Sequence, residues 1–218
     1  MIINNLIKGH QDFKENQSEN FKEDLKRLVK EGQKPDVLFV GCSDSRVTPD
    51  LMLGTKPGDM FILRNVGNFI PPYKHDEDFH GTAAAIQFAV SVLNVHHIIV
   101  CGHSHCGACK SLYEEIPNEE CLVHLKTWLK LGAKAKERTL ANNKFNTKEE
   151  MYRATERNSI RHQLDNLLTY PEIAKKIKSD NIQIHGWYYD IETGNIDVYN
   201  KSNDQFKPIE EWNYNVSK

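Results

Sequence analysis

The chain has 218 residues, of which 39% are hydrophobic and 27% are charged, and its formal net charge is −2. This length supports one sizeable core, and the composition is that of an ordinary globular protein. The charge gives no reason to expect a nucleic-acid partner, which would favour a basic face. The sequence has no apolar run long enough for a membrane span and no secretory signal. We therefore expect a cytoplasmic protein whose five cysteines are thiols or metal ligands.

The first 32 residues form a polar, charge-rich arm. Its second half, "ENFKEDLKRLVKEG", has helical spacing and ends at Gly32. This pattern predicts a helical arm, which packs either on a partner subunit or on its own core. We expect one domain over residues 1–218, with the arm at 1–32 and an α/β core at 33–218.

Short apolar runs rich in β-branched residues follow the arm: "VLFVG" (37–41), "MFILRN" (60–65) and "HIIVCG" (97–102). Such runs are typical of strands that are covered on both faces. Residues 81–95 predict a helix between the second and third strands, and "CGACKSLYEEI" begins another. Strands that alternate with helices indicate a mostly parallel central sheet flanked by helices.

The remainder of the chain is expected to be helical from about 120 to 180. Within it, Ile160, Leu164, Leu167 and Leu168 share one side of a helix that stops at Pro171. Two β runs around the turn signal "ETGN" then predict a hairpin at the sheet edge, over residues 182–200.

Reactive residues follow two of the predicted strands, in "GCSDSR" and in "CGHSHCGAC". Parallel strands end at the same rim of a sheet, so Cys42 can meet His103 and Cys106 although 60 residues lie between Cys42 and His103. Two thiolates and one imidazole favour zinc. Three protein ligands leave a fourth tetrahedral position open, which is typical of a catalytic site.

The other cysteines and His105 are expected to lie outside this site. His105 is adjacent to Cys106 and should point elsewhere. Cys109 forms a rival CxxC pair with Cys106, but it falls inside the predicted helix and should turn toward the core. Cys101 and Cys121 are expected to be buried as small hydrophobic residues.

Asp44 and Arg46 are the charged residues of the turn that follows the first predicted strand, and we expect them to act together. Two thiolates neutralise the zinc charge, so a carboxylate that orients the bound water would compensate. Arg46 can hold Asp44 bidentately and keep it ionised. If Arg46 releases it, Asp44 could bind the zinc and block the open position.

The pairing of "CSDSRV" with "GHSHCGA" resembles the β-class carbonic anhydrases, from about Gln33 to the hairpin. The resemblance implies reversible hydration of carbon dioxide to bicarbonate and a proton, through a zinc-bound hydroxide. It implies zinc held by Cys42, His103 and Cys106, with Asp44 and Arg46 as a catalytic dyad. In the family, the counterpart of Asp44 can be a fourth zinc ligand in a resting form.

The family has two pocket styles, and this chain resembles the plant-like one. Gln33 lies nine residues before Cys42, and Phe61 lies in the second strand, as in that style. Phe88 stands where that style has a tyrosine. The other style places a tryptophan three residues before the cysteine, where this chain has Phe39, so we do not expect its bicarbonate regulation.

The resemblance also implies contacts to substrate and a subunit arrangement. Gln33, Phe61 and Phe88 are expected to line the carbon dioxide pocket, and a backbone N–H near Gly102 could bind the developing carboxylate. Candidate proton shuttles are His75, His80 and His105, and the sequence does not choose among them. A homodimer or tetramer is expected, with N-terminal helices that embrace the neighbouring subunit.

Three other functions are consistent with these residues. A related zinc hydrolase could act on a sulfur analogue of carbon dioxide. A zinc-binding sensor could keep the site without turnover, although Asp44 and Arg46 would then have no use. A thiol redox protein could use Cys106 and Cys109, and it would need no metal.

Overall fold

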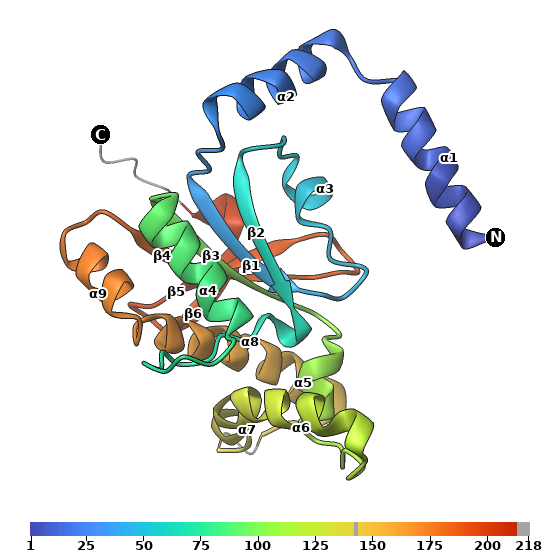
Figure 1. Ribbon diagram of the computed structural model, residues 1–218. Helices are drawn as coiled ribbons and strands as arrows, with labels where there is room; N and C mark the ends of the chain where they lie inside the picture. Colours follow the sequence, from blue (N-terminus) through green and yellow to red (C-terminus); the bar gives the residue numbers. More distant parts are fainter. Residues whose placement is uncertain (142–143, 213–218) are drawn as a thin grey trace. The chain divides into compact units, whose positions relative to one another are not determined.

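The computed structural model describes residues 1–141 and 144–212 and divides the chain into two compact units, Met1–Lys34 and Pro35–Lys218 (Figure 1). The first unit contains helices α1 (Ile2–Glu15) and α2 (Glu19–Glu31). The Ser18 hydroxyl caps α2 by accepting a hydrogen bond from the Phe21 N–H, and the helix ends at Gly32 as predicted. Large apolar side chains along α1 are more than half exposed: Ile2, Ile3, Leu6, Ile7 and Phe13.

Within its described residues, the second unit is built on a six-stranded sheet with the order β2-β1-β3-β4-β5-β6. The strands are β1 (Val37–Cys42), β2 (Met60–Asn65), β3 (His97–His103), β4 (Gln183–Tyr189), β5 (Ile196–Asn200) and β6 (Gln205–Pro208). The four strands from β2 to β4 pair in parallel, and β5 and β6 are antiparallel. The predicted α/β class, mostly parallel sheet and C-terminal edge hairpin are confirmed.

Helices connect the strands and cover the sheet (Figure 1). The α-helices are α3 (Pro49–Leu53), α4 (Gly81–Gln87), α5 (Gly107–Ser111), α6 (Val123–Leu129), α7 (Ala133–Leu140), α8 (Lys148–Leu167) and α9 (Pro171–Lys178). Short helical turns are η1 (Val66–Asn68), η2 (Phe88–Val92), η3 (Glu120–Leu122), η4 (Lys130–Gly132) and η5 (Ile209–Glu211). Over the described residues, no helix combines the length and apolar character that a membrane crossing requires.

The core has a separate cluster on each face of the sheet. On one face, Leu38 and Val100 of the central strands pack with Ile160 and Leu167 of α8 and with Ile86 of α4. On the other face, apolar residues of β1, β3, β4 and β5 pack with α3 and η5. Alternate residues of β1 and β3 therefore face opposite layers, which explains why these strands read as continuous apolar runs.

Several local features differ from the sequence prediction. The helix predicted over 81–95 is α-helical only to Gln87 and continues as the wider π-helical turn η2. The Lys176 ammonium of α9 donates to the Val90 carbonyl at 2.6 Å, so a side chain satisfies backbone in this widened turn. Helix α8 ends at Leu167, and Pro171 begins α9 rather than stopping α8. The strand β6 was not predicted.

Cysteine burial agrees with the prediction at two positions and not at a third. Cys101 and Cys109 are buried in the core. Cys121 is exposed, contrary to expectation, because it lies in the short turn η3 rather than in a packed helix.

Candidate metal centre and active site

The two reactive motifs meet at one edge of the sheet. Cys42 is the last residue of β1 and His103 is the last residue of β3, and these strands are parallel neighbours. Cys106 follows three residues after His103, at the start of α5. The ligand atoms of the three buried side chains lie within 4.8 Å of one another. Cys42, His103 and Cys106 are thus brought together as predicted and could hold a metal ion.

His103 presents one ring nitrogen to this cluster. Its Nδ1 lies 2.8 Å from the Ser104 carbonyl oxygen, which can only accept, so Nδ1 carries the proton. Its Nε2 is buried and has no hydrogen-bond partner among the described residues. A buried, unpartnered nitrogen lone pair beside two thiols is the arrangement expected of a metal ligand.

The two thiols are chemically coupled. The hydrogen bond with the Cys106 thiol and, as a smaller cause, burial raise the pKa of Cys42 to about 12. The Cys42 sulfur also accepts backbone N–H groups, from Asp44 at 3.4 Å and from Gly67 at 3.3 Å. A divalent cation that binds here must displace the thiol protons, and its charge would stabilise the resulting thiolates.

Asp44 and Arg46 form the predicted dyad beside the cluster. Arg46 donates from Nε and Nη2 to the two carboxylate oxygens of Asp44, at 2.9 and 2.8 Å. These hydrogen bonds hold the pKa of Asp44 well below its usual range. Arg46 Nη2 also donates to the His105 carbonyl at 3.0 Å, so the dyad joins both motifs. Asp44 is bound to Arg46 and is not part of the group of three ligand atoms.

The turn after β1 is fixed by an arginine from the neighbouring strand. Arg64 of β2 donates from Nε to the Cys42 carbonyl at 2.8 Å and from Nη2 to the Asp44 carbonyl at 2.7 Å. Two charge-assisted hydrogen bonds on one turn restrict its backbone. They therefore help to hold both the Cys42 thiol and the Asp44 carboxylate in place.

Glu156 of α8 is a site residue that was not predicted from the sequence. Its Oε1 accepts the Cys106 N–H at 2.9 Å and Arg153 Nη2 at 2.8 Å, and its Oε2 accepts the Tyr188 hydroxyl at 2.9 Å. Burial raises the pKa of Glu156 to about 7, and Arg153 and the Cys106 N–H oppose this shift. Glu156 lies one turn before Ile160, so the buried side of the helix was a signal that could have found it.

The remaining predicted site residues are placed less directly. Gln33 belongs to the N-terminal unit, after the end of α2. The rings of Phe61 and Phe88 contact each other, with centroids 5.8 Å apart. Phe61 pairs with Leu38, four residues before Cys42 on β1, so the structure does not bring these rings to the ligand cluster of their own chain. Gly102 lies in β3 against α8, where an added Cβ would come within 2.8 Å of Ile160. Gly102 thus has a packing role whether or not it binds substrate.

His105 points away from the ligand cluster, as predicted. Its Nε2 lies 3.4 Å from the Glu192 carboxylate. A polar cavity of about 560 Å³ begins beside it and Cys106. The cavity is lined by His105, Cys106, Lys110, Glu114, Lys148, Glu149, Tyr152 and Arg153.

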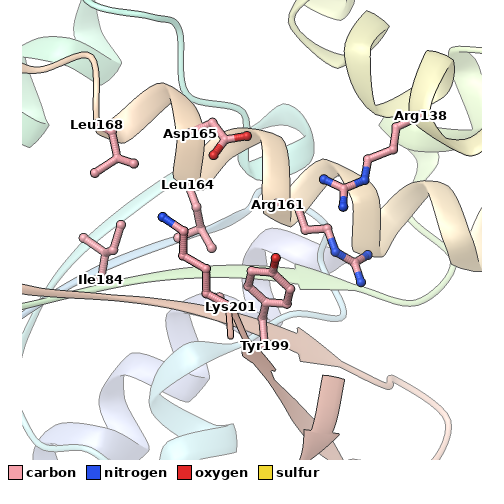
Figure 2. Close-up of a pocket in the computed structure, with 9 residues that line it drawn as sticks. Arg138, Arg161, Leu164, Asp165, Leu168, Ile184, Tyr199 and Lys201 are labelled. Atoms are coloured by element: carbon pink, nitrogen blue, oxygen red, sulfur yellow. The ribbon is translucent and has the colours of Figure 1, made fainter. Parts of the chain in front are cut away.

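A separate cavity of about 90 Å³ lies between α8 and the strands β4 and β5 (Figure 2). Arg138 and Arg161 at its rim both bind the Asp204 carboxylate, at 2.9 and 2.7 Å. Its lining includes none of the three clustered residues. We therefore assign it no part in chemistry at the cluster.

Comparison with known proteins agrees with this site. The family model described as carbonic anhydrase matches residues 37–196. A carbonic anhydrase of Helicobacter pylori strain J99 is 38% identical over 206 residues, which is 93% of each chain. A carbonic anhydrase of Synechocystis is 39% identical over 194 residues, covering 89% of this chain and 70% of that protein.

Solved structures extend the agreement to the fold. The β-carbonic anhydrase CcaA superposes with a TM-score of 0.87 at 36% identity, over 94% of this chain and 91% of that chain. A tetrameric β-carbonic anhydrase from Sordaria macrospora superposes with a TM-score of 0.73 at 28% identity, over 89% and 92%. The family match, the relatives and the fold lead to one conclusion: the chain belongs to the β-class carbonic anhydrases and is an enzyme of that family.

Proposed function

We propose that this enzyme hydrates carbon dioxide reversibly to bicarbonate and a proton, with one zinc ion per chain held by Cys42, His103 and Cys106. The observation that carries the proposal is the convergence of two buried thiols and an imidazole nitrogen within 4.8 Å. The buried His103 Nε2, which makes no hydrogen bond among the described residues, is in keeping with this role.

The donor set fits zinc. Thiolate and imidazole ligands suit this ion, and three protein ligands leave a tetrahedral position for water or substrate. When bound, zinc would supply a Lewis acid that lowers the pKa of a water molecule toward 7. The Ser104 carbonyl keeps the lone pair of His103 Nε2 available for the ion, because it holds the proton on Nδ1.

Asp44 is proposed to orient the attacking water by accepting its hydrogen bond. The low pKa of Asp44 keeps the carboxylate ionised and therefore able to accept at neutral pH. Arg46 binds both carboxylate oxygens and fixes their direction. We propose that Asp44 reaches the metal as a fourth ligand when Arg46 releases it, which would block turnover.

The substrate pocket is proposed to include Gln33, Phe61, Phe88 and a backbone N–H near Gly102. In this proposal, the contacting rings of Phe61 and Phe88 would be the apolar wall for carbon dioxide. Phe88 is 43% exposed, so this wall is open to a small molecule. The polar contacts of Gln33 and of the N–H would bind the carboxylate that develops during attack.

The direct test is stopped-flow hydration of carbon dioxide by zinc-loaded protein, from about pH 7 to 9, because the metal-activated water titrates near 7. Asp44→Ala should lower the rate by about 10² to 10⁴, the contribution typical of a positioned proton acceptor. Asp165→Ala, at an exposed position on α8, is the matched control and should keep full activity. A zinc-loaded parent without activity, or an Asp44→Ala variant as fast as the parent, would contradict the proposal.

We also propose that the two units act as one domain, with the arm at 1–32 and the core at 33–218, in a homodimer or tetramer. The exposed apolar side chains of α1 support the assembly, because a second copy would remove them from water. The relative from Sordaria macrospora is tetrameric. Analytical ultracentrifugation should show an oligomer that Leu6→Glu weakens, and a monomeric parent would refute the assembly.

The cytoplasm is the proposed compartment. All five cysteines are free thiols in the structure, which suits a reducing environment. Fractionation of the source cells tests this, since recovery of the protein outside the cytoplasmic fraction would count against it.

A further inference from the structure

The Cys42 sulfur receives a hydrogen bond from outside its own turn. Besides the Asp44 N–H, it accepts the N–H of Gly67, at 3.3 Å, from the turn η1 that follows β2. This N–H comes from a residue 25 positions away, so it depends on how η1 is held against β1. Hydrogen bonds of this kind withdraw electron density from a metal-binding thiolate and tune the metal.

The backbone at Gly67 is packed into a shape that only glycine fits. Its φ is +79°, in the left-handed region. A Cβ at this position would lie 2.8 Å from the Ala108 Cβ and 2.9 Å from the Phe69 ring. The close approach of η1 to α5 and Phe69 therefore keeps the Gly67 N–H beside the sulfur.

The same peptide group is held at its other end by Trp128 of α6. The indole Nε1–H donates to the Val66 carbonyl oxygen at 2.7 Å. The Val66 carbonyl and the Gly67 N–H belong to one planar trans peptide, so they point in opposite directions. One peptide plane is thus bound by the indole on one side and by the Cys42 sulfur on the other.

We propose that Trp128 is a positioning residue for the metal centre, acting through the Val66–Gly67 peptide on the Cys42 thiolate. The inference rests on the proposed metal site. The indole fixes the rotation of the peptide plane, and its hydrogen bond to the carbonyl also polarises the N–H toward the sulfur. Two thiolates would make a bound ion a weaker Lewis acid. An N–H···S bond lowers the electron donation of one thiolate and would therefore restore part of the Lewis acidity.

The packing around Trp128 agrees with this role. Its ring is partly buried against the cluster that contains Cys42, Phe69, Cys106 and Cys109. A change that keeps an aromatic ring would preserve much of this contact and remove only the donor. Trp128→Phe is therefore the informative variant.

The test uses full-length protein loaded with cobalt(II), whose thiolate-to-metal charge-transfer absorption reports the electron density on sulfur. Trp128→Phe should move this band to lower energy and weaken metal affinity by about 10-fold, the low end for residues that orient ligands. Trp187→Phe is the matched control, because the Trp187 Nε1 has no hydrogen-bond acceptor among the described residues. It should leave both the band and the affinity unchanged.

A second measurement tests the parent directly, whether or not the variant folds. In protein loaded with cadmium-113, the Gly67 amide proton should show scalar coupling to the metal through the N–H···S bond. The coupling should be present in the parent and lost or reduced in Trp128→Phe. A parent without this coupling would overturn the inference.

The results distinguish a wrong role for Trp128 from a wrong metal centre. A parent that binds no cobalt or zinc would overturn the proposed metal centre and the role of Trp128 together. A parent that binds metal, with Trp128→Phe identical to it in band position and affinity, would overturn only the role of Trp128.

Discussion

Each of the three ligand residues is held by a neighbouring group. The Ser104 carbonyl sets the tautomer of His103, and the Gly67 N–H contacts the Cys42 sulfur. Glu156 accepts the N–H of Cys106. Gly67 and Glu156 lie outside the two motifs. The geometry of the site therefore also depends on residues that are not among the three clustered ligands.

Glu156→Gln should destabilise the protein. A glutamine offers one oxygen in place of two, so one of the donors Cys106 N–H, Arg153 and Tyr188 would lose its acceptor inside the core. Because the Glu156 side chain is 1% exposed, we expect a loss of about 1–3 kcal/mol in the free energy of unfolding. Urea denaturation measures it.

The control for this change is Glu149→Gln, at an exposed position in the first turn of the same helix. It should cost less than about 1 kcal/mol, the usual limit for a charge at a helix terminus. Equal stability of Glu156→Gln and the parent would show that the carboxylate is not needed.

Arg46→Lys should impair catalysis while leaving the fold intact. A lysine cannot make the two parallel hydrogen bonds that Arg46 makes to Asp44, and the pair is partly exposed. Asp44 would then be free to turn toward the metal, and we expect carbon dioxide hydration to fall by about 10². Stopped-flow rates and thermal melts are the measurements, with Arg27→Lys on α2 as control. An Arg46→Lys variant with full activity would contradict the assigned role.

At the scale of elements, the sequence predicts the strands that carry the site. The apolar runs at 37–41 and 97–102 correspond to β1 and β3, and each ends in its reactive motif. Strand ends are predictable because apolar content and turn residues are local. Parallel pairing then places Cys42 beside His103 without further information.

Other elements escape prediction because they depend on distant contacts. The π-helical turn after Gln87 meets Lys176, which is far away in the chain. The Glu156 contact joins residues 50 positions apart and requires α8 to pack on β3 and β4. The role of Gln33 stays a prediction, because it lies in the separate N-terminal unit.

The histidines near the start of β3 and β4 should make stability depend on pH. His97 Nδ1 lies 3.1 Å from His185 Nε2, and Asp36 is 3.9 Å from the other nitrogen of His97. Burial, with a smaller effect of His97, lowers the pKa of His185 to about 4. In the unfolded chain His185 therefore takes up a proton near pH 6.5, whereas in the folded chain it stays neutral until about pH 4.

Stability from this group should thus be complete above about pH 6.5 and should fall as the pH drops toward 4, by up to about 3 kcal/mol. Urea denaturation at several pH values measures the slope. His185→Gln removes the titrating ring and should flatten the dependence in this window. A slope that persists unchanged in His185→Gln would assign it to other groups.

At the scale of the molecule, the sheet and the arm serve different purposes. The sheet brings Cys42 and His103, which have 60 residues between them, to one edge, and the helices α5 and α8 pack beside that edge. The arm exposes apolar residues on α1 that its own unit does not cover. Catalysis is therefore expected to follow from the core of each chain, and assembly from the arm.

Cys42, His103 and Cys106 are proposed to hold a zinc ion on which carbon dioxide hydration depends. The most direct measurement is the stopped-flow hydration rate of metal-free protein during titration with zinc. The rate should rise linearly and level off at about one zinc per chain, the number that one three-ligand site binds. Hydration that is independent of added zinc, or zinc binding at this ratio without any hydration, would contradict this role of the three residues.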